Sequence, residues 1–160
     1  MKTIKITSRY SSNKISQAQG NLPDIEQDIC YKDQLSLLNN TYMNNTNNKL
    51  TSSIKKKIQG YKQQDSKWQE RSECNIISFD DTLEKLVCSK LKCYYCSKEI
   101  KLIYNMSREP MQWTLDRINN DIGHTCDNTV IACMRCNLQR RRKGADIFKF
   151  TKSLKIQKQT

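Results

Sequence analysis

The chain has 160 residues, of which 36% are hydrophobic, and it carries a formal net charge of +12. This length accommodates one modest domain with an extension, and the low apolar content excludes a large hydrophobic core. A small domain with so little core usually needs disulfides or a metal ion, and eight cysteines are present. The basic balance predicts affinity for polyanions such as nucleic acids.

The sequence has the features expected of an intracellular protein. Residues 1–14 contain no apolar segment of the kind found in signal peptides, and no apolar run reaches the length of a transmembrane helix. We therefore expect a protein of the cytoplasm or nucleus that is not secreted and has no membrane partner. In that reducing compartment, paired cysteines favour zinc over disulfides.

The first part of the chain is predicted to be a polar extension. Residues 1–49 are rich in Ser, Asn, Gln and Lys, which is typical of partly disordered segments. Within them, residues 24–38 place hydrophobic side chains at helical spacing and predict a short helix. The following Asn-rich stretch, residues 39–49, is predicted to be a linker.

Residues 50–90 are predicted to be a basic helical segment. Its first helix has hydrophobic side chains on one face, at Ile54, Ile58 and Tyr61. Four lysines are predicted to lie off that face (Lys55, Lys56, Lys57 and Lys62). They belong either to an ordinary basic surface or to an arm that grips nucleic acid. Ser78 precedes an acidic start and predicts a second short helix.

The third segment, residues 91–160, contains two Cys-x2-Cys pairs. Its four paired cysteines are Cys93, Cys96, Cys133 and Cys136. Two intervening residues let one tight turn direct both sulfurs to a tetrahedral ion, at about 2.3 Å. Two pairs therefore predict a closed, structural zinc site, with disulfides or free thiols as the alternatives. Structural zinc can stabilise a small domain by on the order of 10 kcal/mol.

The other four cysteines have no such spacing (Cys30, Cys74, Cys88 and Cys126). Unpaired cysteines are most often small buried side chains. Because Cys126 lies two residues from His124, which is the sole histidine, a second metal site there is an alternative interpretation.

Between the two cysteine pairs the sequence predicts a β-hairpin, and after the second pair it predicts a helix. Residues 112–118 and 129–133 are β-type runs separated by turn-forming residues. The next helix begins after the second pair, and Gly144 is predicted to end its first section. Asp116 would then lie on the first strand and Asn137 near the start of the helix. Their oxygens could converge on a hard divalent cation such as Mg²⁺ or Mn²⁺.

Positive charge is concentrated beside this motif. Residues 134–160 carry nine Lys or Arg and one acid, which accounts for +8 of the net charge. Four of these basic residues closely follow Asn137 and the candidate cation site, and they are predicted to bind the phosphates of nucleic acid (Arg140, Arg141, Arg142 and Lys143).

Residues 93–143 resemble the HNH, or ββα-metal, endonuclease family, in its zinc-bearing branch. Asp116 matches the first-strand metal ligand, and Asn137 matches the second metal ligand. Asn128 lies five residues before the second cysteine pair and matches the asparagine that orders the loop and orients the catalytic base. Arg140 matches the family's basic position.

The resemblance implies an α+β fold, in which a zinc-stapled ββα-metal domain follows a mainly helical, partly disordered extension. It also implies a metal-dependent DNA endonuclease that hydrolyses phosphodiester bonds, with structural Zn²⁺ and catalytic Mg²⁺ or Mn²⁺. DNA is the expected partner, and RNA is the alternative. A homodimer is compatible with this interpretation, because so small a site often needs two copies to cut both strands.

Arg117 departs from the family pattern, which usually has a water-activating histidine at this position. Arginine remains cationic and cannot act as a general base, but it can clamp a phosphate oxygen. The base would then be His124, a tyrosine (Tyr94, Tyr95 or Tyr104) or a metal-bound water. A non-catalytic zinc-finger DNA- or RNA-binding protein is the main alternative, and a zinc knuckle for protein interaction is another.

Overall fold

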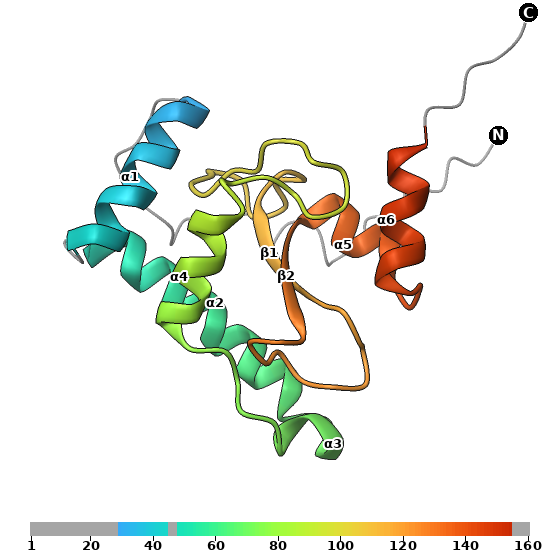
Figure 1. Cartoon of the computed structure of the whole chain (residues 1–160). Coiled ribbons are helices and arrows are strands. Elements are labelled where there is room, and N and C mark those ends of the chain that lie inside the picture. The colour runs from blue at the N-terminus through green and yellow to red at the C-terminus, as the bar shows by residue number, and fades with distance from the viewer. Residues whose placement is uncertain (1–28, 45–47, 155–160) are drawn as a thin grey trace, which may run out of the picture.

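The computed structural model describes residues 29–44 and 48–154, and it combines helices with a two-stranded sheet (Figure 1). The elements are α1 (Tyr31–Asn44), α2 (Asn48–Asp65), α3 (Gln69–Ser72), α4 (Phe79–Cys88), β1 (Trp113–Arg117), β2 (Thr129–Cys133), α5 (Met134–Arg140) and α6 (Ala145–Ser153). This mixture is compatible with the predicted α+β class. Among the described residues, no helix has both the length and the hydropathy of a membrane span.

Helix α1 lies further along the chain than predicted. It begins at Tyr31 and continues to Asn44, so the linker prediction is wrong for that part of the Asn-rich stretch. Leu38 and Thr41 are buried on one face of α1, and this packing outweighs the low helix propensity of asparagine. The predicted disorder of residues 1–23 and the predicted start of the helix, residues 24–28, lie outside the described residues.

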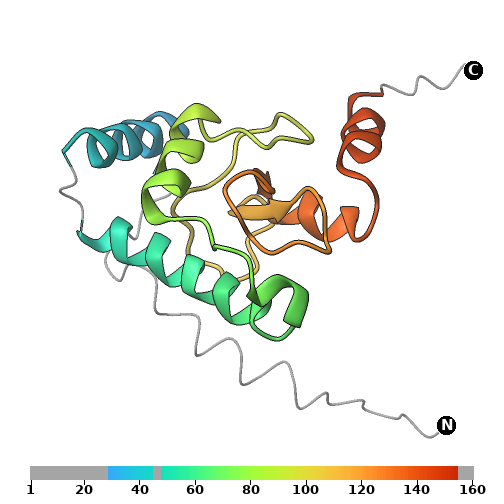
Figure 2. The same ribbon diagram turned by 60° about the horizontal axis from the view of Figure 1, so that its bottom comes forward.

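The predicted helices α2 and α4 are confirmed. Helix α4 starts at the expected cap, where the Ser78 hydroxyl accepts a hydrogen bond from the N–H of Asp81 (3.0 Å). The Asp81 carboxylate accepts from the N–H of Ser78 in return, which completes a capping box. Helix α4 contacts α1, α2 and β2, and therefore joins the extension to the hairpin (Figure 2).

Lys57 does not lie off the packed face of α2, as its position in the sequence suggested. It is half-buried, and its Nζ donates a hydrogen bond to the carbonyl of Trp113. The ammonium lies 4.3 Å from the ring centroid of Trp113 and 5.0 Å from that of Tyr104. Cation–π contacts and the packing of the long aliphatic stem offset part of the cost of burying the ammonium.

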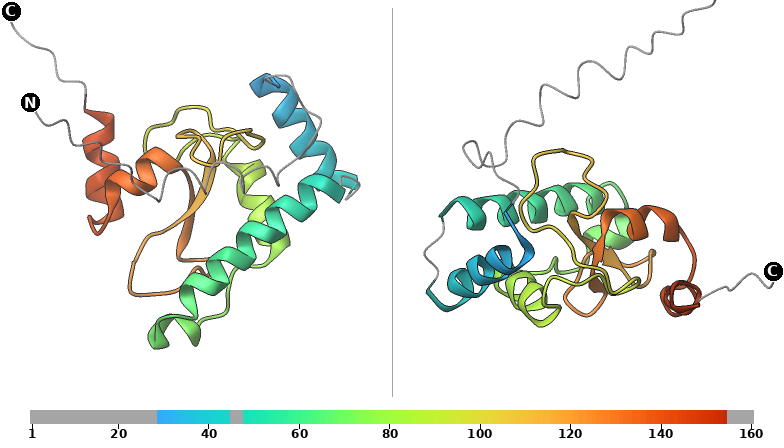
Figure 3. Two further views of the ribbon diagram at one scale, coloured as in Figure 1. Left: turned by 180° about the vertical axis from the view of Figure 1, so that it is seen from behind. Right: turned by 90° about the horizontal axis from the view of Figure 1, so that it is seen from above.

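One hydrophobic core spans the boundary predicted at residue 90. Leu50 and Ile54 of α2 belong to the same buried cluster as Leu86 of α4 and Trp113 and Leu115 of β1. Helices α2 and α4 therefore pack against the hairpin (Figure 3). They complete the core of the C-terminal half.

The hairpin is antiparallel and leads directly into α5. Trp113 pairs with Cys133, and Asp116 pairs with Val130. Helix α5 ends just before Arg141, which adopts a left-handed φ of 54°. Gly144 is the N-cap of α6 and does not end α5, which corrects the sequence prediction. Helix α6 stands at the outer edge, away from α1 and α4 (Figures 1 and 3).

Candidate functional site

The first cysteine pair occupies a tight turn beside β2. The N–H of Ser97 donates to the carbonyl of Cys93 (2.9 Å), and Ser97 has a φ of 56°. The N–H of Tyr94 donates to the carbonyl of Ile131 on β2 (2.9 Å). These bonds hold Cys93 and Cys96 next to the second pair.

Cys133 and Cys136 complete the cluster at the junction of β2 and α5. Cys133 caps α5, because its sulfur accepts a hydrogen bond from the N–H of Cys136 (3.3 Å). The four sulfurs lie within 4.8 Å of one another, and those of Cys96 and Cys133 are 4.0 Å apart. A hydrogen bond from Cys133 lowers the pKa of Cys93 to about 5, whereas the same bond raises the pKa of Cys133 and burial raises that of Cys136 to about 12, so a metal ion would have to displace their protons. The cluster could hold a metal ion, as its spacing predicts.

Cys126 and His124 do not form part of a second cluster of this kind. Within residues 29–44 and 48–154, the four cysteines are the only group of three or more His, Cys, Asp or Glu side chains able to share an ion. Cys30 and Cys88 are exposed, and Cys74 and Cys126 are half-buried, so none of the four is the fully buried thiol expected from sequence.

Asp116 is buried on β1, with 4% of its surface exposed. Its Oδ2 accepts hydrogen bonds from the Tyr95 hydroxyl (2.6 Å) and from Nε of Arg140 (2.7 Å). Its Oδ1 accepts one from Nη2 of Arg140 (3.0 Å). The carboxylate predicted to bind a cation is thus already paired with a bidentate arginine, and one lone pair of Oδ1 is left without a protein donor.

Arg140 is 1% exposed and ties α5 to the end of β1. Besides Asp116, it donates to the carbonyls of Arg117 and Lys143 and to Oδ1 of Asn120 (2.8 Å). Burial opposes its charge, but the bonds and charge of Asp116 outweigh this and raise the pKa of Arg140. Arg140 was predicted to bind nucleic acid, yet it faces the interior in this conformation.

Asn137 is fixed against β1 by its amide nitrogen. Nδ2 donates to the Thr114 hydroxyl (3.1 Å) and to the carbonyl of Leu115 (3.5 Å). Its Oδ1 accepts no hydrogen bond from the part of the chain that the structure describes. Asn137 and Asp116 line the same cleft, so the two predicted cation ligands are brought together.

The loop between β1 and β2 is organised by Asn128. Its Oδ1 accepts a hydrogen bond from the N–H of Asn119 (2.8 Å). Its Nδ2 donates to the carbonyls of Asn119 (2.9 Å), Ile122 (3.2 Å) and Gly123 (3.0 Å). Four bonds to one side chain close the loop that carries His124. This geometry agrees with the loop-ordering role that the family resemblance implies.

His124 is only 4% exposed, and α2 holds it in place. Its backbone N–H donates to Oδ2 of Asp65 (2.7 Å), and its Nδ1 lies 2.9 and 3.0 Å from the two carboxylate oxygens. The ring of Tyr61 packs on the imidazole, with centroids 4.6 Å apart. Burial lowers the pKa of His124, and the bond to Asp65 offsets only part of that effect. The ring is therefore neutral at neutral pH.

Arg117 ends β1 next to this pair. Its Nη1 lies 3.5 Å from Oδ1 of Asp65, and this buried nitrogen has no hydrogen-bond partner in the described chain. Burial and then the charge of Arg71 lower the pKa of Arg117, although a guanidinium stays charged at ordinary pH. Nη1 is sealed from solvent and faces Asp65, but 18% of the Arg117 side chain is exposed and lines the cleft, where a cation is suited to an anionic ligand.

The tyrosines named as alternative bases are less suitably placed. Burial raises the pKa of Tyr104 to about 12, and burial and the bond to Asp116 raise that of Tyr95. Tyr94 packs its ring beneath the ammonium of Lys149, at 3.8 Å. None of the three tyrosines lines the cleft that contains Asp116.

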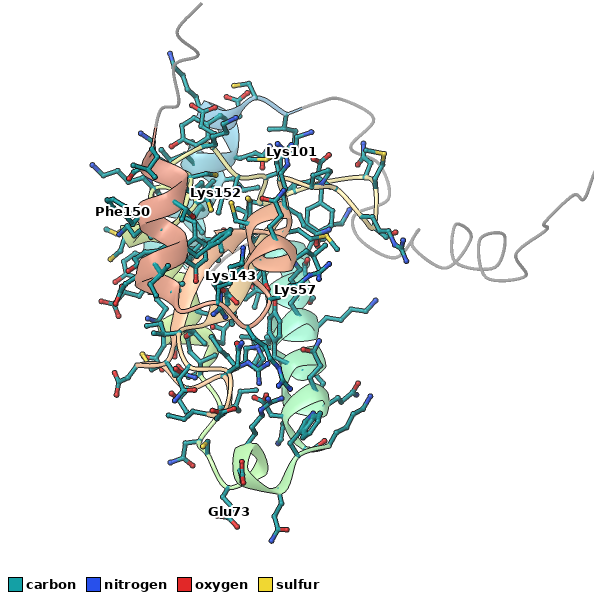
Figure 4. The ribbon with its side chains drawn as sticks, turned by 90° about the vertical axis from the view of Figure 1, so that its right-hand side faces the viewer. Lys57, Glu73, Lys101, Lys143, Phe150 and Lys152 are labelled. Carbon is teal, nitrogen blue, oxygen red and sulfur yellow. The ribbon has the colours of Figure 1, made fainter. Side chains whose placement is uncertain are left out.

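Most residues predicted for catalysis and nucleic-acid binding line one cleft of about 360 Å³, but Asn128 and Lys143 do not. Its lining joins the hairpin, its loop and α5 with additional cations (Asp116, Arg117, His124, Asn137, Arg71, Arg141 and Arg142). Arg71 and Arg142 also line an adjoining cavity that reaches Lys143. Positive charge therefore continues along the turn between α5 and α6, where Lys143 is exposed (Figure 4).

The sequence-based prediction missed the residues that α2 and α3 contribute, which are Tyr61, Asp65 and Arg71. One signal was present for Asp65. It follows Tyr61 by four residues, and so shares the packed face of α2. An acid on a packed face indicates a buried partner. No local pattern indicates that this partner is His124, which lies 59 residues further along the chain.

Comparison with known proteins gives little further information. No family model matches this chain, and no solved structure matches it. The chain is 38% identical over 65 residues to an uncharacterised protein, R423, of Acanthamoeba polyphaga mimivirus. The match covers 41% of this chain and spans a tenth of the viral protein. That protein's name assigns no activity.

Proposed function

We propose that this protein binds DNA in the arginine-lined cleft and hydrolyses its phosphodiester bonds, as an HNH-like endonuclease. The observation that supports this function best is the shared cleft. Asp116, Arg117, His124 and Asn137 come from the hairpin, its loop and α5, and all four line it. An ordinary basic surface would not require a buried histidine and a buried carboxylate beside arginines in the same cavity.

The cations of the cleft have two separate roles in this proposal. Arg117 lines the cleft and binds a non-bridging oxygen of the scissile phosphate through the exposed part of its side chain, while its sealed Nη1 faces Asp65. Arg141, Arg142 and Lys143 are exposed and contact the flanking backbone. Arg140 is left out of the interface, because its burial serves the ion pair with Asp116.

We assign the cysteine cluster to a structural zinc ion. Tetrahedral zinc with bonds of about 2.3 Å separates neighbouring sulfurs by roughly 3.8 Å. The sulfurs of Cys96 and Cys133 are 4.0 Å apart and all four lie within 4.8 Å of one another, which is close to this spacing. Four thiolates leave no coordination position for substrate. This ion would therefore hold the turn of Cys93 and Cys96 to α5 and take no part in hydrolysis.

Asp116 and Asn137 would hold the catalytic divalent cation. Oxygen donors suit Mg²⁺ or Mn²⁺, and the free positions are Oδ1 of Asn137 and one lone pair on Oδ1 of Asp116. When bound, such a cation stabilises the charge that develops on the phosphate. Proton removal from water is assigned to His124, whose ring is neutral and lines the same cleft.

Nicking of supercoiled plasmid DNA tests the proposal. The wild-type chain is expected to nick with Mg²⁺ or Mn²⁺ and to stop in EDTA. Asn137→Ala is expected to lower the rate by about 10- to 100-fold, because a ligand of the cation is lost. Gln139→Ala is the matched control, since this exposed amide lies on α5 but does not line the cleft. Absence of divalent-dependent nicking, or equal rates in both variants, would contradict the proposal.

A second candidate function is nucleic-acid binding without catalysis. The pairing of Asp116 with Arg140 favours it, because an arginine already neutralises the carboxylate that the cation needs. In that case the wild type would bind DNA or RNA with a steep salt dependence and cut neither. Asn137→Ala would then bind as tightly as the wild type. Competition between DNA and RNA of equal length identifies the preferred nucleic acid.

A further inference from the structure

The contact between Asp65 and His124 defines which ring nitrogen carries the proton. Nδ1 lies 2.9 and 3.0 Å from the two oxygens of Asp65, and an ionised carboxylate can only accept hydrogen bonds. Nδ1 must therefore be the protonated nitrogen. In the neutral ring, Nε2 is then unprotonated and carries the lone pair.

The surroundings of His124 prevent the ring from turning. Asp65 also accepts a hydrogen bond from the backbone N–H of His124 (2.7 Å), so one carboxylate binds both the backbone and the ring of this residue. The N–H of Ile77 donates to the carbonyl of His124 (2.7 Å), and the ring of Tyr61 covers the imidazole. Tyr61 and Asp65 are four residues apart on α2, which puts both on one face of the helix.

The other ring nitrogen keeps access to the cleft. Nε2 has no hydrogen-bond partner in the described part of the chain, and it is not among the sealed, unpaired side-chain atoms there. Arg117 ends β1 on the same side, with its Nη1 3.5 Å from Asp65. His124 and the side chain of Arg117 therefore line the same space, although Nη1 of Arg117 is itself sealed against Asp65.

We propose that Asp65, a residue of α2 outside the HNH-like segment, is a positioning residue that fixes His124 in the Nδ1–H tautomer and presents Nε2 as the proton acceptor. This inference rests on the proposed function. A water proton passes to Nε2, while the water oxygen forms a bond to phosphorus and the bond to the leaving ester oxygen breaks. The leaving oxygen then takes a proton from solvent. Asp65 takes no part in bond making or breaking; it acts through His124, and it also lies 3.5 Å from Nη1 of Arg117.

Because His124 is the sole histidine, ¹⁵N-histidine labelling of the full chain reads this ring alone. The ring-nitrogen NMR signals of the wild type at pH 8 are expected to report Nδ1 as protonated and Nε2 as bare. Asp65→Asn preserves the shape of the side chain but removes its charge. It is expected to shift the tautomer population toward Nε2–H and to lower the nicking rate by about 10- to 100-fold. DNA affinity should change by less than about threefold, since a merely structural defect would reduce binding as well.

Glu73→Gln is the matched control, because it removes one acidic charge from an exposed position at the far end of the molecule (Figure 4). It is expected to leave both the tautomer and the nicking rate unchanged. A wild-type ring with the proton on Nε2 would overturn the inference, and so would Asp65→Asn with an unchanged tautomer. A wild type with the Nδ1–H tautomer that cuts no DNA would instead contradict the proposed function, since the NMR signal does not depend on activity.

Discussion

Asp116 has a structural role that any mutational test of catalysis must take into account. Its carboxylate and the guanidinium of Arg140 are both almost completely buried, and Nε of Arg140 lies 2.7 Å from Oδ2. Removing one partner of such a pair leaves an uncompensated charge in the interior. Loss of activity in Asp116→Ala would therefore not distinguish a lost ligand from a damaged fold.

We predict that Asp116→Ala lowers the free energy of unfolding by about 3–5 kcal/mol, as breaking a buried ion pair does. Replacing both partners, in Asp116→Leu with Arg140→Met, is expected to cost much less than the sum of the two single changes. Urea titrations of the wild type, the two single variants Asp116→Leu and Arg140→Met, and the double variant, followed by circular dichroism, measure this coupling; Asp116→Ala is titrated in the same way. A loss below about 1 kcal/mol in Asp116→Ala would contradict the structural role.

Lys57 is predicted to make stability depend on pH. Burial lowers the pKa of Lys57 to about 7, whereas an unfolded lysine titrates near about 10.4. Between pH 7 and 9 the unfolded chain therefore binds more protons at this side chain, so its contribution to the free energy of unfolding rises with pH. The free energy of unfolding of the wild type minus that of Lys57→Met, measured by urea titration, should increase by about 2 kcal/mol from pH 7 to pH 9. Parallel pH profiles of the two proteins would refute this.

The loop between β1 and β2 approaches α2 and α3 so closely that only glycine fits at position 123. A Cβ on Gly123 would lie 2.9 Å from the backbone carbonyl oxygen of Arg71 and 3.2 Å from Oδ2 of Asp65. The backbone atom cannot move aside cheaply, so the loop that carries His124 would have to shift. This close approach is what allows an acid on α2 to reach a histidine on the hairpin loop.

Two glycine substitutions should therefore have opposite effects on stability. Gly123→Ala is expected to lower the free energy of unfolding by about 1–3 kcal/mol through overpacking. Gly60→Ala is expected to raise it by about 0.5–1 kcal/mol, because a Cβ there meets nothing within 4 Å in the middle of α2. Thermal unfolding measures both, and the NMR signals of His124 should move only in Gly123→Ala. The same sign for both changes would be inconsistent with the close approach.

The features that could be predicted from sequence are those whose signal lies within a short stretch of chain. The Cys-x2-Cys spacing, the Ser78 cap and the hairpin each depend on a few neighbouring residues, and the structure contains all three. The pairing of Asp65 with His124 and that of Asp116 with Arg140 join residues 59 and 24 positions apart. Such contacts depend on how α2 and α5 pack, which no local pattern specifies.

The cysteine cluster connects most of these distant parts, so metal removal should affect the whole molecule. It joins the turn at Cys93 to β2 and to the start of α5, and α5 carries both Asn137 and Arg140. Without the proposed ion, no bond would tie the four sulfurs together, and α5 would be held less firmly against the hairpin. The ion pair of Asp116 with Arg140 would then lose its support.

We predict that the purified chain contains about one zinc ion and that a strong chelator removes it together with the cooperative thermal transition. Cys96→Ser should reduce the zinc content and have the same effect, because three thiolates close the tetrahedron poorly. Cys88→Ser is the matched control, since this exposed thiol at the end of α4 lies outside the cluster. Elemental analysis with calorimetry measures both quantities. A metal-free chain that unfolds at the same temperature as the purified protein would show that core packing alone holds α5 in place, and would leave the cysteines without the proposed role.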